Sequence, residues 1–215
     1  MTDSPVGDRG HQPSIFLANS CLFMSLAPWR SPLARALHRN RSRAESRYPQ
    51  LATVRPDGRP ANRTVVFRDF WADTNCLLFV TDARSDKLHH IAQHSGAALC
   101  WYFTQTREQF RLSGELRALT ADNKKAAEIQ VRYDLWHRLS DNARQQFAWP
   151  SPGQPRVATS YEPTDLSESA PLDTFAILVF DPDTVDHLAL KGTPQNRWQY
   201  HRQSDRSWQM LEVNP

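Results

Sequence analysis

The stretch Leu51–Trp71 reads LATVRPDGRPANRTVVFRDFW and decides the fold. Leu51–Val54 is short and apolar, and Asn62–Trp71 is rich in β-branched and aromatic residues, which is typical of strands. Between them, residues 55–58 read RPDG and combine the proline, aspartate and glycine of a tight turn. The sequence therefore predicts a β-hairpin here.

Further strands are expected on the C-terminal side, with helices between some of them. Ser31 and Pro32 begin a helix that carries many arginines and ends before Pro49. A short helix is expected at 87–94 and longer helical segments between 123 and 147. The expected strands are 76–81, 97–103, 109–119, 174–180, 184–190, 197–202 and 208–213. Because strands and helices do not alternate regularly, an antiparallel barrel with helical insertions is favoured over a doubly wound parallel sheet.

The composition excludes several classes of protein. The chain has 215 residues and a formal charge of +3, and 22 of its 26 basic residues are arginine. Its apolar runs are too short for a membrane span. Three cysteines without CxxC spacing exclude a disulfide scaffold and a four-cysteine zinc site, and favour a reducing, cytoplasmic location. Residues 1–23 are predicted to be a flexible extension, Met24 a possible start, and residues 24–215 one domain.

No glycine pattern for phosphate binding is present, since neither GxGxxG nor GxxxxGK[ST] occurs. Side chains would have to hold a phosphate instead. Arg63 and Arg68 flank the apolar residues of one predicted strand, unless they are solvated arginines of an edge strand. Ser85 and Lys87 stand where a strand passes into a helix, a suitable anion site or an ordinary helix cap. Gln109 begins a strand with alternating polar residues and could bind a heterocyclic ring or face solvent.

These segments, in this order, resemble the pyridoxamine 5'-phosphate oxidase family, which are dimeric FMN-binding split barrels. The matches are Arg63 with Arg68, Thr81 with Ser85 and Lys87, Gln109 with Gly114, and a C-terminal segment that starts at Arg197. The sequence is most similar to a divergent, oxidase-like branch. The resemblance implies a mainly β fold with helical insertions (α+β), an antiparallel split β-barrel.

The resemblance also implies the cofactor, its site and the reaction. FMN would lie at the interface of a homodimer, where a primary amine or alcohol of a small phosphorylated substrate is oxidised to an aldehyde, with hydride transfer to FMN and reoxidation by oxygen. Arg63, Ser85 and Lys87 would hold the FMN phosphate, and Gln154 and Arg197 would reach it from the partner subunit. The full set of cofactor residues it implies is Arg63, Thr64, Val65, Val66, Arg68, Thr81, Ser85, Lys87, Gln109, Gln154 and Arg197.

Substrate recognition departs from the family pattern. The family's Arg-x-His near the C-terminus is replaced by Thr193-Pro194-Gln195, and the family arginine before Lys87 is Asp86. Arg68 takes the place of a family lysine near the substrate phosphate. Trp136, Ser140 and Arg144 follow at four-residue steps and, on one helix face, would form a phosphate clamp, or simply a helix surface with one packed tryptophan.

Other functions remain open. An FMN-dependent reductase or a flavin carrier that does not act on vitamin B6 would share the cofactor site. A nucleic-acid-binding protein could use the basic helix 33–47, although such a charge run is usually a solvated helix face. His90 and His94 are four residues apart, but no third ligand is evident, and no metal is expected.

Overall fold

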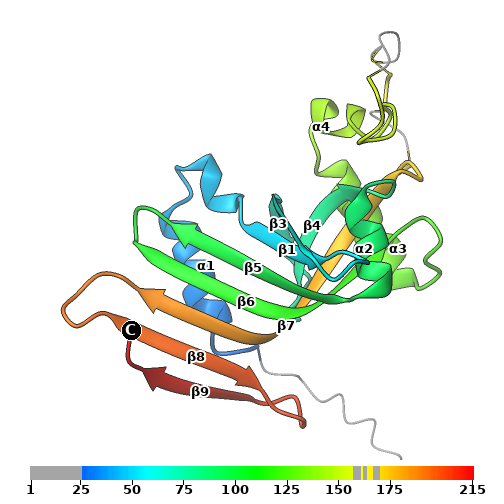
Figure 1. Cartoon of the computed structure of the whole chain (residues 1–215). Coiled ribbons are helices and arrows are strands. Elements are labelled where there is room, and N and C mark those ends of the chain that lie inside the picture. The colour runs from blue at the N-terminus through cyan, green and yellow to red at the C-terminus, as the bar shows by residue number, and fades with distance from the viewer. Residues whose placement is uncertain (1–25, 157–160, 162–163, 167–169) are drawn as a thin grey trace, which may run out of the picture.

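The computed structural model describes residues 26–156, 161, 164–166 and 170–215. The predicted extension, residues 1–23, and Met24 lie outside the described residues. Within them, nine strands form one antiparallel sheet in the order β2-β1-β5-β6-β7-β4-β3, with β8 and β9 beyond β7 (Figure 1). The prediction of a mainly β fold with helical insertions is confirmed. No helix of the described part is long and apolar enough to cross a membrane.

The predicted hairpin is present, but its second strand is shorter than expected. β1 (Gln50–Val54) pairs with β2 (Pro60–Thr64), and a separate strand, β3 (Phe67–Phe70), pairs with β4 (Leu77–Asp82). The prediction of one strand over 62–71 is therefore wrong. β2 and β3 stand at opposite ends of the sheet order, so residues 65–66 pass from one edge of the sheet to the other. The N–H of Val65 donates to the carbonyl of Pro49 (3.0 Å) and fixes this crossing.

The centre of the sheet is a long antiparallel unit. β5 (Gly96–Phe103) and β6 (Glu108–Leu119) form the predicted second hairpin, and β6 pairs with β7 (Phe175–Ala189). β7 was expected as two strands and is one. Its first half pairs with β4 and its second half with β8 (Asn196–Arg202), which pairs with β9 (Trp208–Val213). The two halves of the barrel therefore share this strand.

Two hydrophobic cores lie on opposite faces of β4 and β7, which explains why both strands are buried nearly throughout their apolar runs. The barrel core contains Trp29, Leu33, Phe67, Phe79, Trp101, Phe103, Phe110 and Phe180. The second core lies between the sheet and two helices, and contains Leu78, Leu119, Leu135, Trp136, Phe147, Phe175 and Ile177. These helices are α3 (Ala126–His137) and α4 (Asp141–Gln145).

The N-terminal helix ends earlier than predicted. α1 (Arg30–Arg39) stops at Asn40, and only a short 3-10 helix, η1 (Ala44–Arg47), follows. Asn40 is fully buried; its amide donates to the carbonyl of Ala36 (2.8 Å), and its side-chain oxygen accepts from the N–H of Gln105 (2.9 Å). These bonds tie the helix end to the β5–β6 turn. A continuous basic helix over 33–47 is therefore wrong.

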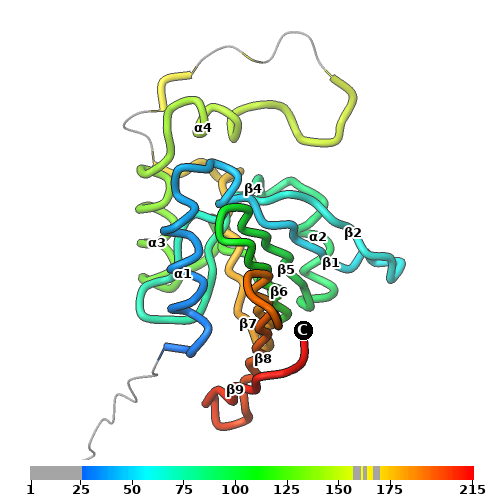
Figure 2. The backbone as a smooth tube through the Cα atoms, turned by 90° about the vertical axis from the view of Figure 1, so that its left-hand side faces the viewer, coloured from blue at the N-terminus to red at the C-terminus, as the bar shows by residue number. Residues whose placement is uncertain are grey.

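The remaining helix, α2 (Asp86–Gln93), lies near the predicted position and follows β4 directly. In Figure 2, α1 and α3 lie to one side of the strands and α2 to the other, while the segment after α4 rises over the end of the sheet. The junction of β4 and α2 contains Thr81, Ser85 and Lys87, the polar residues that the sequence singled out.

Candidate functional site

A cluster of hydroxyl groups and one ammonium lies where β4 passes into α2. The Lys87 ammonium donates to the hydroxyls of Thr81 and Ser85, both at 2.9 Å, and these two hydroxyls are 3.3 Å apart. The Ser85 hydroxyl donates to the carbonyl of Asp82 (2.7 Å) and does not cap the helix. Lys87 therefore gathers two polar groups from a turn of seven residues.

Arg63 extends the positive charge of this cluster from β2. It donates to the Thr53 hydroxyl (2.7 Å) and to the carbonyl of Leu51 (3.3 Å). Burial and then the charge of Arg63 lower the pKa of Lys87, and burial and then Arg55 lower the pKa of Arg63. The two predicted phosphate ligands are thus close enough to repel each other.

The cluster fits a phosphate group. In the described part of the chain neither Arg63 nor Lys87 forms an ion pair with a carboxylate, and both bond only neutral oxygens. An anion would offset the repulsion between the two cations and accept hydrogen bonds from the hydroxyls. Asp86, which replaces a family arginine, is exposed. The cations are therefore suited to the phosphate of FMN.

Residues 64–66, where the chain crosses between the sheet edges, differ in exposure and in hydrogen bonding. Thr64 is exposed and exchanges side-chain hydrogen bonds with Gln50, while Val65 is buried and its N–H is occupied by Pro49. Val66 is half-buried and faces a cavity. The interpretation of Arg63 and Arg68 as flanking residues of one strand is wrong, because they lie on β2 and β3.

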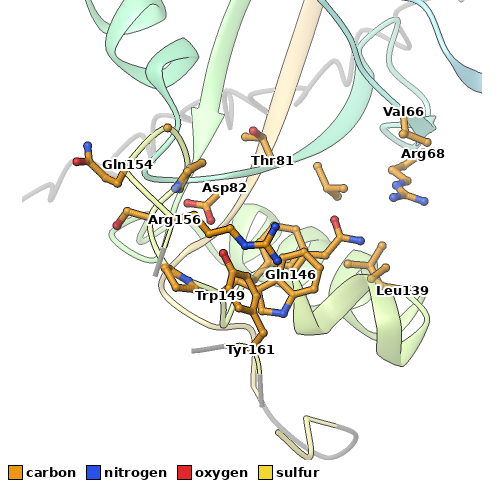
Figure 3. Close-up of a pocket in the computed structure, with 17 residues that line it drawn as sticks. Val66, Arg68, Thr81, Asp82, Leu139, Gln146, Trp149, Gln154, Arg156 and Tyr161 are labelled. Atoms are coloured by element: carbon orange, nitrogen blue, oxygen red, sulfur yellow. The ribbon is translucent and has the colours of Figure 1, made fainter. Parts of the chain in front are cut away.

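The cavity beside Val66 has a volume of about 980 Å³ and lies between the ends of β3 and β4, the α4 region, residues 149–156 and Tyr161 (Figure 3). Four of the predicted residues line it together: Val66, Arg68, Thr81 and Gln154. Its aromatic and polar wall was not predicted from the sequence; this wall includes Gln146, Phe147, Trp149, Arg156 and Tyr161. The prolines of residues 149–156 gave no sign that these residues would line a cavity beside β4.

Arg68 is the cation of β3 that lines this cavity. Its Nε is buried and has no hydrogen-bond partner among the described residues. Burial and then the nearby charge of Arg47 lower the pKa of Arg68. Asp82 also lines the cavity, but Arg84 binds both of its carboxylate oxygens (2.9 and 2.6 Å). Arg68 can therefore receive an anionic ligand.

Gln109 and Arg197 lie on the outer face of the sheet and do not line this cavity. Both are cross-strand partners of Leu188, so they occupy one row across β6, β7 and β8. The Arg197 guanidinium binds Asp186 (2.8 Å), which also accepts from Arg111 (2.8 Å), and these bonds lower the pKa of Asp186 against the effect of burial. A single chain thus places Gln109 and Arg197 outside the cavity that Val66, Arg68, Thr81 and Gln154 line.

The expected helix face of Trp136, Ser140 and Arg144 does not form. α3 ends at His137 and α4 starts at Asp141, so the four-residue spacing does not run along one helix. Trp136 is fully buried against Phe147 and Phe175 in the second core. Ser140 is exposed, and Arg144 is buried and pairs with Asp141 (2.5 Å). The α4 region turns Leu139, Ala143 and Gln146 to the cavity instead.

The chain is similar to known proteins of one family. The family model described as "Pyridoxamine 5'-phosphate oxidase, FMN-binding domain" matches residues 26–120. Pyridoxine/pyridoxamine 5'-phosphate oxidase 2 of Arabidopsis thaliana is 36% identical over 168 residues, which cover 77% of this chain and 85% of the relative. The oxidase of Myxococcus xanthus strain DK1622 is 31% identical, and the alignment covers 52% of this chain and 49% of that protein.

Solved structures show the same fold. A pyridoxamine 5'-phosphate oxidase-related, FMN-binding protein from Nostoc punctiforme is 51% identical, with a TM-score of 0.84 over 89% of this chain and 100% of that chain. PhzG from Burkholderia lata, in complex with tetrahydrophenazine-1-carboxylic acid, shares the fold at 20% identity and a TM-score of 0.71, over 86% of this chain and 91% of that chain. The antiparallel split barrel is thereby confirmed, and the chain belongs to the pyridoxamine 5'-phosphate oxidase family of FMN-binding proteins, with FMN as its cofactor.

Proposed function

We propose that this protein is an FMN-dependent oxidoreductase that oxidises a primary amine or alcohol of a small phosphorylated substrate to an aldehyde, with oxygen as the final electron acceptor. The observation that carries the proposal is the cluster in which Lys87 joins the hydroxyls of Thr81 and Ser85 beside Arg63, while neither cation forms an ion pair within the described residues. The name of the Arabidopsis relative supports the vitamin B6 5'-phosphates as substrates.

In this proposal the protein binds and orients, and its cofactor performs the redox step. Lys87, Ser85 and Arg63 hold the FMN phosphate by charge-assisted hydrogen bonds, and Thr81 accepts from Lys87 and keeps its ammonium in place. When bound, FMN supplies the acceptor for the hydride that leaves the substrate carbon. Val66 would lie along the flavin and Arg68 would bind the substrate anion in the adjoining cavity.

A specific observation favours a second function, a flavin reductase or flavin carrier. The α4 region presents no cation to the cavity and lines it with Leu139, Ala143, Gln146 and Phe147. The Arg-x-His of the family is also absent from residues 193–195. Arg68 and Arg156 are the arginines that line this cavity in the described chain, so substrate phosphate would have fewer ligands than the family pattern supplies.

Aerobic turnover separates the two functions. We expect the yellow protein to form aldehyde and peroxide from pyridoxamine 5'-phosphate or pyridoxine 5'-phosphate. The Arg68→Gln variant should keep FMN and raise KM at least about tenfold, since a charge-assisted contact contributes about 1.5–3 kcal/mol. If neither product forms from either substrate while FMN stays bound, the oxidase assignment is wrong and the reductase or carrier function takes its place.

We further propose a cytoplasmic homodimer in which Gln109, Gln154 and Arg197 of one subunit complete the FMN site of the other. Arg197 and Gln109 share one row on the outer face and do not line the cavity of their own chain, which supports a contribution to another chain. Gln154 lines the cavity of its own chain together with Thr81, so for this residue the partner role rests on the family resemblance alone.

Mixing two defective variants tests the shared site. Lys87→Ala and Arg197→Ala homodimers should each bind FMN weakly, because every site lacks one ligand. After denaturation and refolding together, each mixed dimer should contain one site with both substitutions and one intact site, so high-affinity FMN binding returns in part. No recovery in dimers that are shown to be mixed would place Arg197 and Lys87 in the site of one chain.

A further inference from the structure

A buried chain of hydrogen bonds lies behind Arg63. The guanidinium Nη1 is 2.7 Å from the Thr53 hydroxyl, and this hydroxyl is 3.1 Å from Nδ1 of His90. Thr53 is 2% exposed and His90 is 7% exposed, so water does not replace these contacts easily. These hydrogen bonds link three elements, since Thr53 is in β1, Arg63 in β2 and His90 in α2.

The direction of these bonds assigns the protons. Arginine can only donate, so the Thr53 oxygen accepts from Arg63 and its hydrogen remains to be donated. Among the described residues Nδ1 of His90 is the acceptor within reach, and it takes this hydrogen when the imidazole proton is on Nε2. Burial and the charge of Arg63 lower the pKa of His90, Arg55 and His89 act in the same direction, and Asp86 opposes them. A neutral His90 at neutral pH is consistent with this assignment.

We propose that Thr53 and His90 are positioning residues that orient Arg63 for the FMN phosphate; this inference rests on the phosphate site of the proposed function. An arginine side chain has many rotamers, and holding one of them before the ligand arrives raises affinity. One guanidinium nitrogen, Nη1, is used for both contacts with the scaffold, to Thr53 and to the carbonyl of Leu51. The other guanidinium N–H groups can then serve the phosphate.

The dissociation constants of FMN and riboflavin test this role, because riboflavin lacks the phosphate. In the full-length chain, Thr53→Val keeps the shape of the side chain and removes the acceptor. It should weaken FMN binding about fivefold, because the lost bond orients Arg63 and does not itself touch the phosphate, and it should leave riboflavin binding unchanged. Thr53→Ser should restore the affinity for FMN.

His90 provides an independent pair of variants. His90→Leu removes the acceptor for Thr53 and should weaken FMN binding about threefold, a smaller effect because it acts through Thr53. His90→Asn keeps a polar atom near the position of Nδ1 and should bind FMN nearly as tightly as the original protein. This pair decides the question if Thr53→Val fails to fold.

The result that overturns the inference is distinct from failure of the site itself. Equal weakening of FMN and riboflavin binding would show a merely structural role for Thr53 and His90. Unchanged FMN binding in Thr53→Val, with a loss in Lys87→Ala, would remove the positioning role alone. Unchanged FMN binding in Lys87→Ala would remove the phosphate site and, with it, this inference.

Discussion

Replacing Lys87 with alanine is expected to weaken FMN binding by about 1.5–3 kcal/mol, which is roughly 10- to 150-fold in the dissociation constant. The ammonium is the group that joins Thr81 and Ser85, so its removal takes away a charge and the centre of the cluster. Fluorescence titration with FMN measures the effect. Lys124→Ala, which removes an exposed lysine before α3, is the matched control and should bind FMN normally.

The pH dependence of binding gives a second test of Lys87. Burial and Arg63 lower the pKa of its ammonium in the FMN-free protein, so it loses its proton at lower pH than an ordinary lysine. FMN affinity should therefore decline as pH rises through this pKa, and the decline should be absent from Lys87→Ala. Equal affinities of the variant and the original protein throughout would mean that the phosphate is bound elsewhere.

Gly114→Ala is expected to destabilise the fold by about 3 kcal/mol, at the upper end of the usual cost of overpacking. A Cβ at this position would lie 2.2 Å from the carbonyl oxygen of Asp181 and 2.7 Å from the Cα of Pro182. Both atoms belong to the backbone of β7, so no side-chain rotation can relieve the overlap. Urea unfolding should show a lower midpoint with an unchanged slope.

Gly96→Ala is the matched control for this substitution. Gly96 begins β5, and no atom lies within 4 Å of a Cβ built there. The alanine should leave stability unchanged or raise it by less than about 1 kcal/mol, because it restricts the unfolded chain. Two variants with the same midpoint would show that β7 can move away from β6 without cost.

Local features of the site could be predicted from the sequence. Thr81, Ser85 and Lys87 lie within one strand end, one turn and one helix start, so chain connectivity alone brings them together. The β1–β2 turn was equally clear from its proline and glycine. The hydrogen bonds that link Arg63 to Thr53 and Thr53 to His90 could not be predicted. They depend on the register of β1 with β2 and on the packing of α2 against β1.

The main errors in the prediction from the sequence concern where strands break and where they continue. The run of β-branched residues at 62–71 gives no sign that the chain changes sheet edge at Val65. Conversely, two strands were expected at 174–180 and 184–190, yet β7 is continuous, because the ladder shifts register opposite Pro182, between Ser113 and Gly114. The spacing of Trp136, Ser140 and Arg144 failed for a similar reason, since residues 138–140 interrupt the helix.

The short crossing at Val65 and Val66 has a thermodynamic consequence. These two residues close the barrel, and Val66 also forms part of the wall of the cavity beside Thr81. A molecule held there binds the closed barrel and not the open chain, so each tenfold rise in its free concentration above saturation adds about 1.4 kcal/mol to the work of unfolding. Coenzyme supply would then set how long the polypeptide survives, as well as how fast it works.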